Sequence, residues 1–124
     1  MSKVDTAIEQ IRTQASKLHQ HLDEASAKNE AAMRKASEDT AGKAQQLATK
    51  LRAAAQEHRT DAAAKFAGAA TSLEAAAASA KKAMDAKQSD LRERNDETLH
   101  HVRAALQHVT EGIAAQAARV KQNV

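Results

Sequence analysis

The sequence predicts an all-α fold, and three observations support this prediction. The chain of 124 residues contains no proline and 32 alanines, and alanine has the highest helix propensity because it loses no side-chain entropy on ordering. Apolar and small residues recur in steps of three, four and four, an 11-residue rhythm close to the helical repeat. This stripe, the seam, runs from Leu22 to Ala117 without Asp, Glu, Lys or Arg, although 28% of the chain is charged, and its members include Asn29, Thr40, Met84, Gln88 and Asn95. We therefore expect long helices with one charge-free seam.

The first zone, residues 1–40, has bulky apolar residues at heptad spacing. It carries six basic and seven acidic side chains. Heptad spacing places apolar side chains on one helix face, as in helices that pack against a partner helix. The heptad positions are Val4, Ile8, Ile11, Ala15, Leu18 and Leu22.

The second zone, residues 41–88, is basic and its seam is mostly alanine. It carries eight basic and four acidic side chains. Small side chains allow helices to approach each other closely. We expect this zone to contain the turn, because Gly68 is a candidate helix terminator and Thr71–Glu74 has the form of a capping box.

The third zone, residues 89–124, is balanced in charge, with five basic and five acidic side chains. Bulky apolar residues return here at heptad spacing, which predicts a second helix able to pair with the first zone. These residues are Leu99, Val102, Leu106, Val109, Ile113, Val120 and Val124.

A fold-back near residue 64 would pair the two bulky zones, since Leu22 would then face Leu106. With a break at residues 67–71, the sequence predicts a long antiparallel hairpin with helices over about 3–67 and 71–122. We expect it to dimerise into a four-helix bundle or coiled coil. The whole chain, 1–124, is then a single all-helical domain.

The alternative is one continuous long helix. The seam keeps its phase through Gly42, Gly68 and Ser89, whereas an inserted loop normally resets the helical phase. Other candidate breaks are weaker, and they lie at residues 37–42 and at Ser89-Asp90 with Asn95-Asp96 after it.

The motifs that support catalysis are missing from this sequence. There is no cysteine, no glycine-rich phosphate loop and no nucleophile elbow. A Glu-x-x-His motif at Glu97 and His100 stands alone, whereas di-iron bundles need a second motif and further inward carboxylates. We predict a protein that is not an enzyme, with no catalytic, cofactor or metal residues. The N-terminus lacks an apolar run of signal-peptide length, so we expect a cytoplasmic location.

We expect the seam to be the functional surface. Leu, Ile, Val and Phe number only 17, so a lone hairpin would bury little apolar area. Self-association into a homo-oligomer or a partner helix would complete the burial, which predicts a structural or interaction protein. The predicted interaction seam is Ile8, Ile11, Leu18, Leu22, Leu47, Leu51, Phe66, Leu73, Leu91, Leu99, Val102, Leu106 and Ile113.

The basic residues of the second zone suggest an anionic partner. They could contact a membrane surface or, nonspecifically, the phosphates of a nucleic acid. The candidate contacts are Lys43, Lys50, Arg52, Arg59, Lys65, Lys81, Lys82 and Lys87.

The segments Thr60–Ala70 and Ala76–Lys87 resemble the 11-residue repeats of group 3 late-embryogenesis-abundant proteins. Apolipoprotein-like surface helices share this periodicity. The resemblance covers residues 41–90. It implies a stress-protective or surface-coating amphipathic helix that becomes helical on drying or on a lipid or protein surface, and this is the alternative function.

Overall fold

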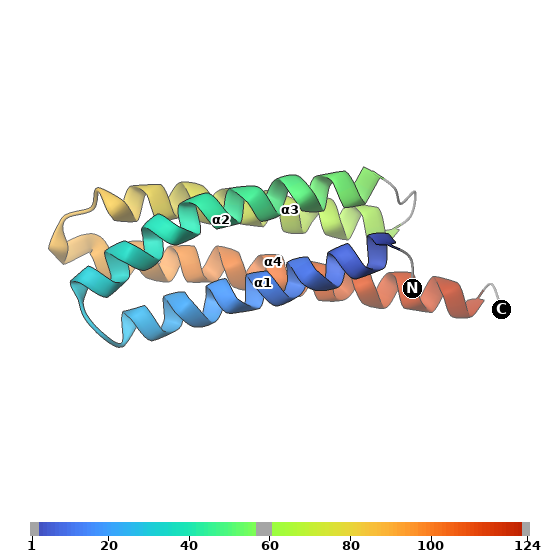
Figure 1. Cartoon of the computed structure of the whole chain (residues 1–124), viewed down its shortest axis with the longest axis horizontal. Helices are drawn as coiled ribbons and strands as arrows, with labels where there is room; N and C mark the ends of the chain where they lie inside the picture. The colour runs from blue at the N-terminus through green and yellow to red at the C-terminus, as the bar shows by residue number, and fades with distance from the viewer. Residues whose placement is uncertain (1–2, 57–60, 123–124) are drawn as a thin grey trace.

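The computed structural model of the chain is a bundle of four α-helices (Figure 1). It describes the backbone of residues 3–56 and 61–122 and the side chains of residues 6–56 and 62–116. No strand occurs in these ranges. The helices are α1 (Lys3–Ser26), α2 (Glu30–Gln56), α3 (Asp61–Met84) and α4 (Gln88–Gln122).

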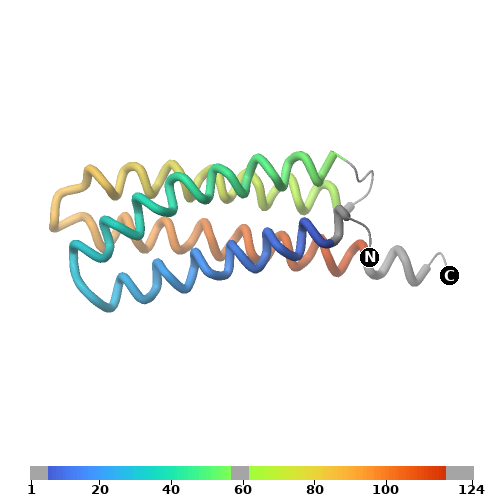
Figure 2. The backbone as a smooth tube through the Cα atoms, viewed as in Figure 1, coloured from blue at the N-terminus to red at the C-terminus, as the bar shows by residue number. Residues whose placement is uncertain are grey.

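Successive helices run in opposite directions, and α4 returns beside α1 to close the bundle. Figure 2 shows the turns at residues 27–29 and 85–87 together at one end of the bundle. Helix α2 also contacts α4 across the bundle. Among the described residues, contacts are dense between α2 and α3 and between α3 and α4, and sparser around α1.

The predicted hairpin with helices over 3–67 and 71–122 is wrong, and so is the single continuous helix. The chain reverses at residues 27–29 and 85–87, and it passes from α2 to α3 across residues 57–60, which lie outside the described residues. Each expected arm of the hairpin is therefore folded in two. The four-helix bundle that we expected from a dimer is made within one chain.

The expected break at residues 67–71 lies inside α3, because the residues that suggested it make other contacts. Thr71 Oγ1 does not cap a helix but donates a hydrogen bond to the Ala67 carbonyl at 3.2 Å. Glu74 pairs with Arg52 on α2. A Cβ at Gly68 would lie 3.8 Å from the His108 ring, so this glycine lies at the contact between α3 and α4.

The weaker candidate breaks are also wrong in detail. Residues 37–42 lie within α2, and Asn95-Asp96 lie within α4. Ser89-Asp90 form the first turn of α4, just after the real turn at residues 85–87. The sequence therefore indicated this region but placed the break too late.

The three-, four- and four-residue spacing of the seam continues through both turns, because residues at the turns themselves occupy seam positions. Asn29, a seam position, precedes α2, and its Oδ1 accepts a hydrogen bond from the Ala32 amide at 2.9 Å. Met84 and Gln88 are exposed seam positions at the two ends of the other turn. Asn29, Met84 and Gln88 are thus seam positions at or beside the turns, so an unbroken phase does not require an unbroken helix.

The register between the first and last zones differs from the predicted one. Helices α1 and α4 do pack side by side, but Asn95 rather than Leu106 is the neighbour of Leu22: Asn95 Nδ2 donates to the Leu22 carbonyl at 3.5 Å. Arg103 Nε donates to His19 Nε2 at 3.0 Å in the same register. The shift arises because α2 ends at Gln56 and α3 begins at Asp61, so the chain passes its midpoint earlier than the fold-back expected near residue 64.

Candidate functional site

The predicted interaction seam forms the core of the bundle. All of its members belong to one apolar cluster, in which Leu106 and Ile113 are half-buried and the others are buried. Phe66 is fully buried, and a Cβ on Gly112 would lie only 2.5 Å from its ring. The seam residues thus contact one another within the chain.

This core is built from small side chains. About half of the buried apolar cluster is alanine. Since each buried methyl or methylene group contributes only about 0.8 kcal/mol, an alanine-rich interface is weak for its length. Alanine also favours helical backbone locally, but most of the stability of a helix in a protein comes from packing of its apolar face.

The core also contains polar atoms without partners. Within the described residues, Ser37 Oγ, Thr40 Oγ1, Asn95 Oδ1 and His108 Nδ1 are buried and have no hydrogen-bond partner. A buried polar atom that is left unpaired destabilises the folded state by about 1–3 kcal/mol. Thr40 and Asn95 are members of the seam, so its polar positions weaken the closed bundle.

The structure separates the predicted anionic contacts into two groups. Arg52 binds Glu74 and Thr71 across the α2–α3 interface, and Lys65 Nζ lies 2.9 Å from Glu111 Oε2 on α4. The hydrogen bond from Lys65 and its positive charge lower the pKa of Glu111. These cations hold helices together. Arg59 lies outside the described residues, and the rest are exposed: Lys43, Lys50, Lys81, Lys82 and Lys87.

Two of the exposed lysines line a groove between α1 and α2. Lys43 and Lys50 on α2 face Lys17 on α1, and the buried Leu18 and Leu47 also line the groove. The volume of the groove is about 610 Å³. The remaining lining residues are Gln14, His21, Asp39 and Gln46.

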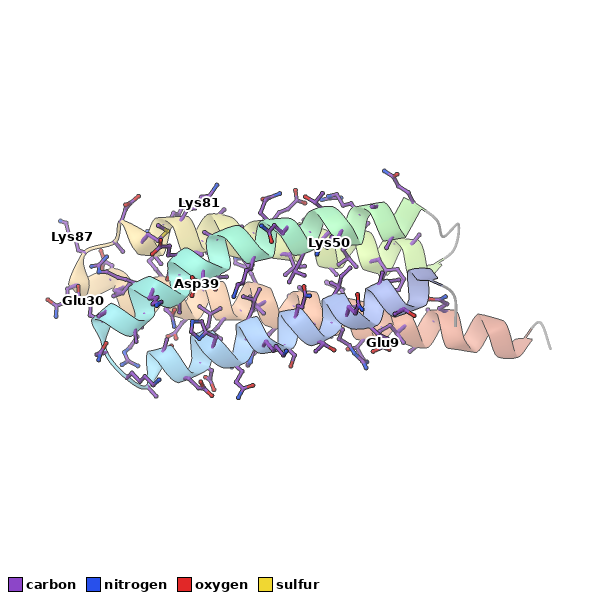
Figure 3. The ribbon with its side chains drawn as sticks, viewed as in Figure 1. Glu9, Glu30, Asp39, Lys50, Lys81 and Lys87 are labelled. Atoms are coloured by element: carbon purple, nitrogen blue, oxygen red, sulfur yellow. The ribbon has the colours of Figure 1, made fainter. Side chains whose placement is uncertain are left out.

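The basic character continues from this groove toward α3. A shallower hollow of about 570 Å³ shares Gln46 and Lys50 with the groove and reaches Lys81. Figure 3 shows Asp39 and Lys50 on α2 and Lys81 on the neighbouring α3. At Asp39 the groove carries its own acid, whose Oδ2 lies 3.5 Å from His21 Nε2.

Lys17 is the member of this groove that the sequence did not indicate. It belongs to the first zone, which is slightly acidic overall, and it is 26 residues from Lys43 in the chain. Only the antiparallel pairing of α1 with α2 places them together. Knowledge of the turn at residues 27–29 would have been needed to find it.

The described residues form no group of three or more His, Cys, Asp or Glu side chains that could hold a metal ion. His100 and His101 contact each other edge to face, with ring centroids 5.7 Å apart. Over the same described residues, no helix is both long enough and apolar enough to cross a membrane.

Comparison of the chain with known protein families, with characterised proteins and with solved structures finds no match. The two features available for a functional argument are therefore the seam inside the bundle and the groove between α1 and α2.

Proposed function

We propose that the chain is a non-enzymatic interaction protein whose bundle opens and presents its apolar seam to a partner helix. The carrying observation is that most of the charge-free seam lies in the buried core, in one unbroken phase across the turns. Helices separated at these turns would each keep one continuous apolar face. The simplest partner is a second copy of the chain.

Helix α1 is the element that opens most readily. Among the described residues it contacts α2 and α4 sparsely, and it makes no contact with α3. Its polar links to α4 include the exposed bond from Arg92 Nη2 to the Ser26 carbonyl at 3.2 Å and the buried bond from Asn95 Nδ2, whose own Oδ1 is left without a partner. Opening here exposes Ile8, Ile11, Leu18 and Leu22.

An opened α1 can bind the equivalent site of a second copy. Exchange of identical elements between protomers restores the same contacts in the dimer that the monomer lost, so it requires little additional free energy. In the exchanged dimer, Asn95 of one copy would again lie beside Ser26, now supplied by the other. Self-association through the seam is thereby compatible with a closed monomeric bundle.

A disulfide lock tests this function, because the chain contains no cysteine of its own. The side chains of Ser26 on α1 and Asn95 on α4 contact each other. A disulfide in a Ser26→Cys/Asn95→Cys variant can therefore hold α1 against α4. Gly68→Cys/His108→Cys is the matched control, because a Cβ at Gly68 would lie 3.8 Å from His108 Cγ and the disulfide ties α3 to α4.

We expect light scattering after chromatography to show dimer at high concentration for the control lock in its oxidised form. The oxidised α1 lock should remain monomeric, and reduction should restore the dimer. Equal dimerisation of both oxidised variants, or dimer in neither even after reduction, would contradict the proposal.

The second candidate is a surface-covering amphipathic helix. The specific observation in its favour is a core that is rich in alanine and contains buried polar atoms without hydrogen-bond partners. Such a core lowers the free energy needed to transfer the seam from the bundle to an apolar surface. The same locked variants distinguish the two functions. Vesicles that contain phosphatidylserine should then bind the reduced α1 lock and not its oxidised form, at concentrations where no dimer forms.

A further inference from the structure

The groove between α1 and α2 is a second interaction surface, distinct from the seam. We propose that it binds an acidic, amphipathic helical segment of a partner protein. This proposal does not depend on opening, because the groove exists only while α1 lies against α2.

The lysines of the groove are uncommitted cations. Described arginines are mostly held by partners within the bundle: Arg34 Nη1, for example, donates to the Met84 carbonyl at 2.9 Å. By contrast, Lys17, Lys43 and Lys50 make no ion pair with any described residue. Three ammonium groups around one groove attract carboxylates, and no described acid forms an ion pair with any of them.

The spacing of these lysines matches the repeat of a helix. Lys43 and Lys50 are seven residues apart on α2, so they lie on one face about 10.5 Å apart. A partner helix with two glutamates seven residues apart presents them at the same separation. Apolar residues between those glutamates would lie over Leu18 and Leu47 at the base of the groove.

The acid of the groove argues against a uniformly charged polyanion. Asp39 lies on the lining beside His21, and a run of phosphates or a charged membrane surface would place negative charge against it. A peptide can leave that position uncharged and place its carboxylates only at the lysines. The recessed leucines likewise match an apolar side chain better than a sugar-phosphate backbone.

Fluorescence anisotropy with a labelled peptide tests the proposal. The probe is an alanine-rich peptide of about 20 residues, longer than the ~12–15 residues at which isolated helices are marginal in water, with two glutamates seven residues apart on either side of two leucines. We expect the Lys43→Gln/Lys50→Gln variant to bind it roughly five- to thirtyfold more weakly, since two exposed charge pairs are removed. The matched control, Lys28→Gln/Lys35→Gln, removes two exposed lysines that do not line the groove and should bind as the parent does.

The peptide with glutamine in place of both glutamates should not bind, and the oxidised α1 lock should bind the glutamate peptide undiminished. The inference is wrong if both lysine pairs weaken binding equally, or if the oxidised lock abolishes it. It is also wrong if the groove substitutions weaken binding to phosphatidylserine vesicles or a DNA oligonucleotide more than binding to the peptide. Failure of the lock to block dimerisation would leave these outcomes unaffected, so the two proposals can fail separately.

Discussion

The two sides of the bundle use the same seam in different ways. Between α3 and α4, small residues bring the helices together: Phe66 lies against Gly112, Gly68 faces the ring of His108, and Lys65 pairs with Glu111. Between α1 and α2, the helices are separated by a groove lined with unpaired lysines. The seam defines which face is buried, whereas the size of the residues beside it determines how tightly each pair packs.

The largest expected effect comes from substituting a buried leucine by aspartate, once on α3 and once on α1. Leu73 on α3 and Leu22 on α1 are both fully buried, and an unpaired buried carboxylate destabilises a fold by several kcal/mol. Leu73→Asp should unfold the whole bundle, with loss of most helical circular dichroism. Leu22→Asp should release α1 alone and keep α2 to α4 helical.

Limited proteolysis with mass spectrometry reads out this difference. The Leu22→Asp variant should be cut first within residues 6–26, while the rest of the chain resists. Simultaneous cleavage of all four helices in both variants would show that the bundle is one cooperative unit.

Substitution of two glycines by alanine should give the next largest effect on the free energy of unfolding. Gly112→Ala places a Cβ 2.5 Å from Phe66 Cε1, and overpacking of this kind destabilises by about 1–3 kcal/mol. Gly42→Ala is the matched control: nothing lies within 4 Å of its Cβ, so helix propensity should stabilise the protein by about 0.5–1 kcal/mol. Urea denaturation measures both. Stabilisation by both substitutions would show that the α3–α4 contact is loose, and Phe66→Leu should restore stability to Gly112→Ala.

The smallest effect concerns the ion pair across α3 and α4. Because the hydrogen bond from Lys65 lowers the pKa of Glu111, this pair stabilises the bundle above the unfolded pKa of glutamate. That stabilisation is lost as the pH falls through the lowered pKa of Glu111. Lys65→Gln should therefore reduce the melting temperature slightly at neutral pH and have no effect once Glu111 is protonated in both proteins. An equal reduction at both pH values would assign the effect to packing of the lysine stem.

The sequence was sufficient for the helical class and for the buried face, since a charge-free seam in an alanine-rich chain has few other interpretations. It failed at the turns because the residues used as markers have other partners, as Glu74 has in Arg52. The true turn at Asn29 was hidden because asparagine is also an acceptable seam residue and preserves the phase. The groove was only half predictable: Lys43 and Lys50 stood out in the basic zone, whereas Lys17 depends on the pairing of α1 with α2.

We expect α1 to open independently of the tightly packed α3 and α4. Amide hydrogen exchange by mass spectrometry tests it most directly, because exchange from each helix reports the free energy of its own opening. The amides of α1 should exchange faster than those of α3, and the oxidised Ser26→Cys/Asn95→Cys lock should slow α1 to the α3 rate. Equal protection of α1 and α3 in the unlocked protein would contradict the account.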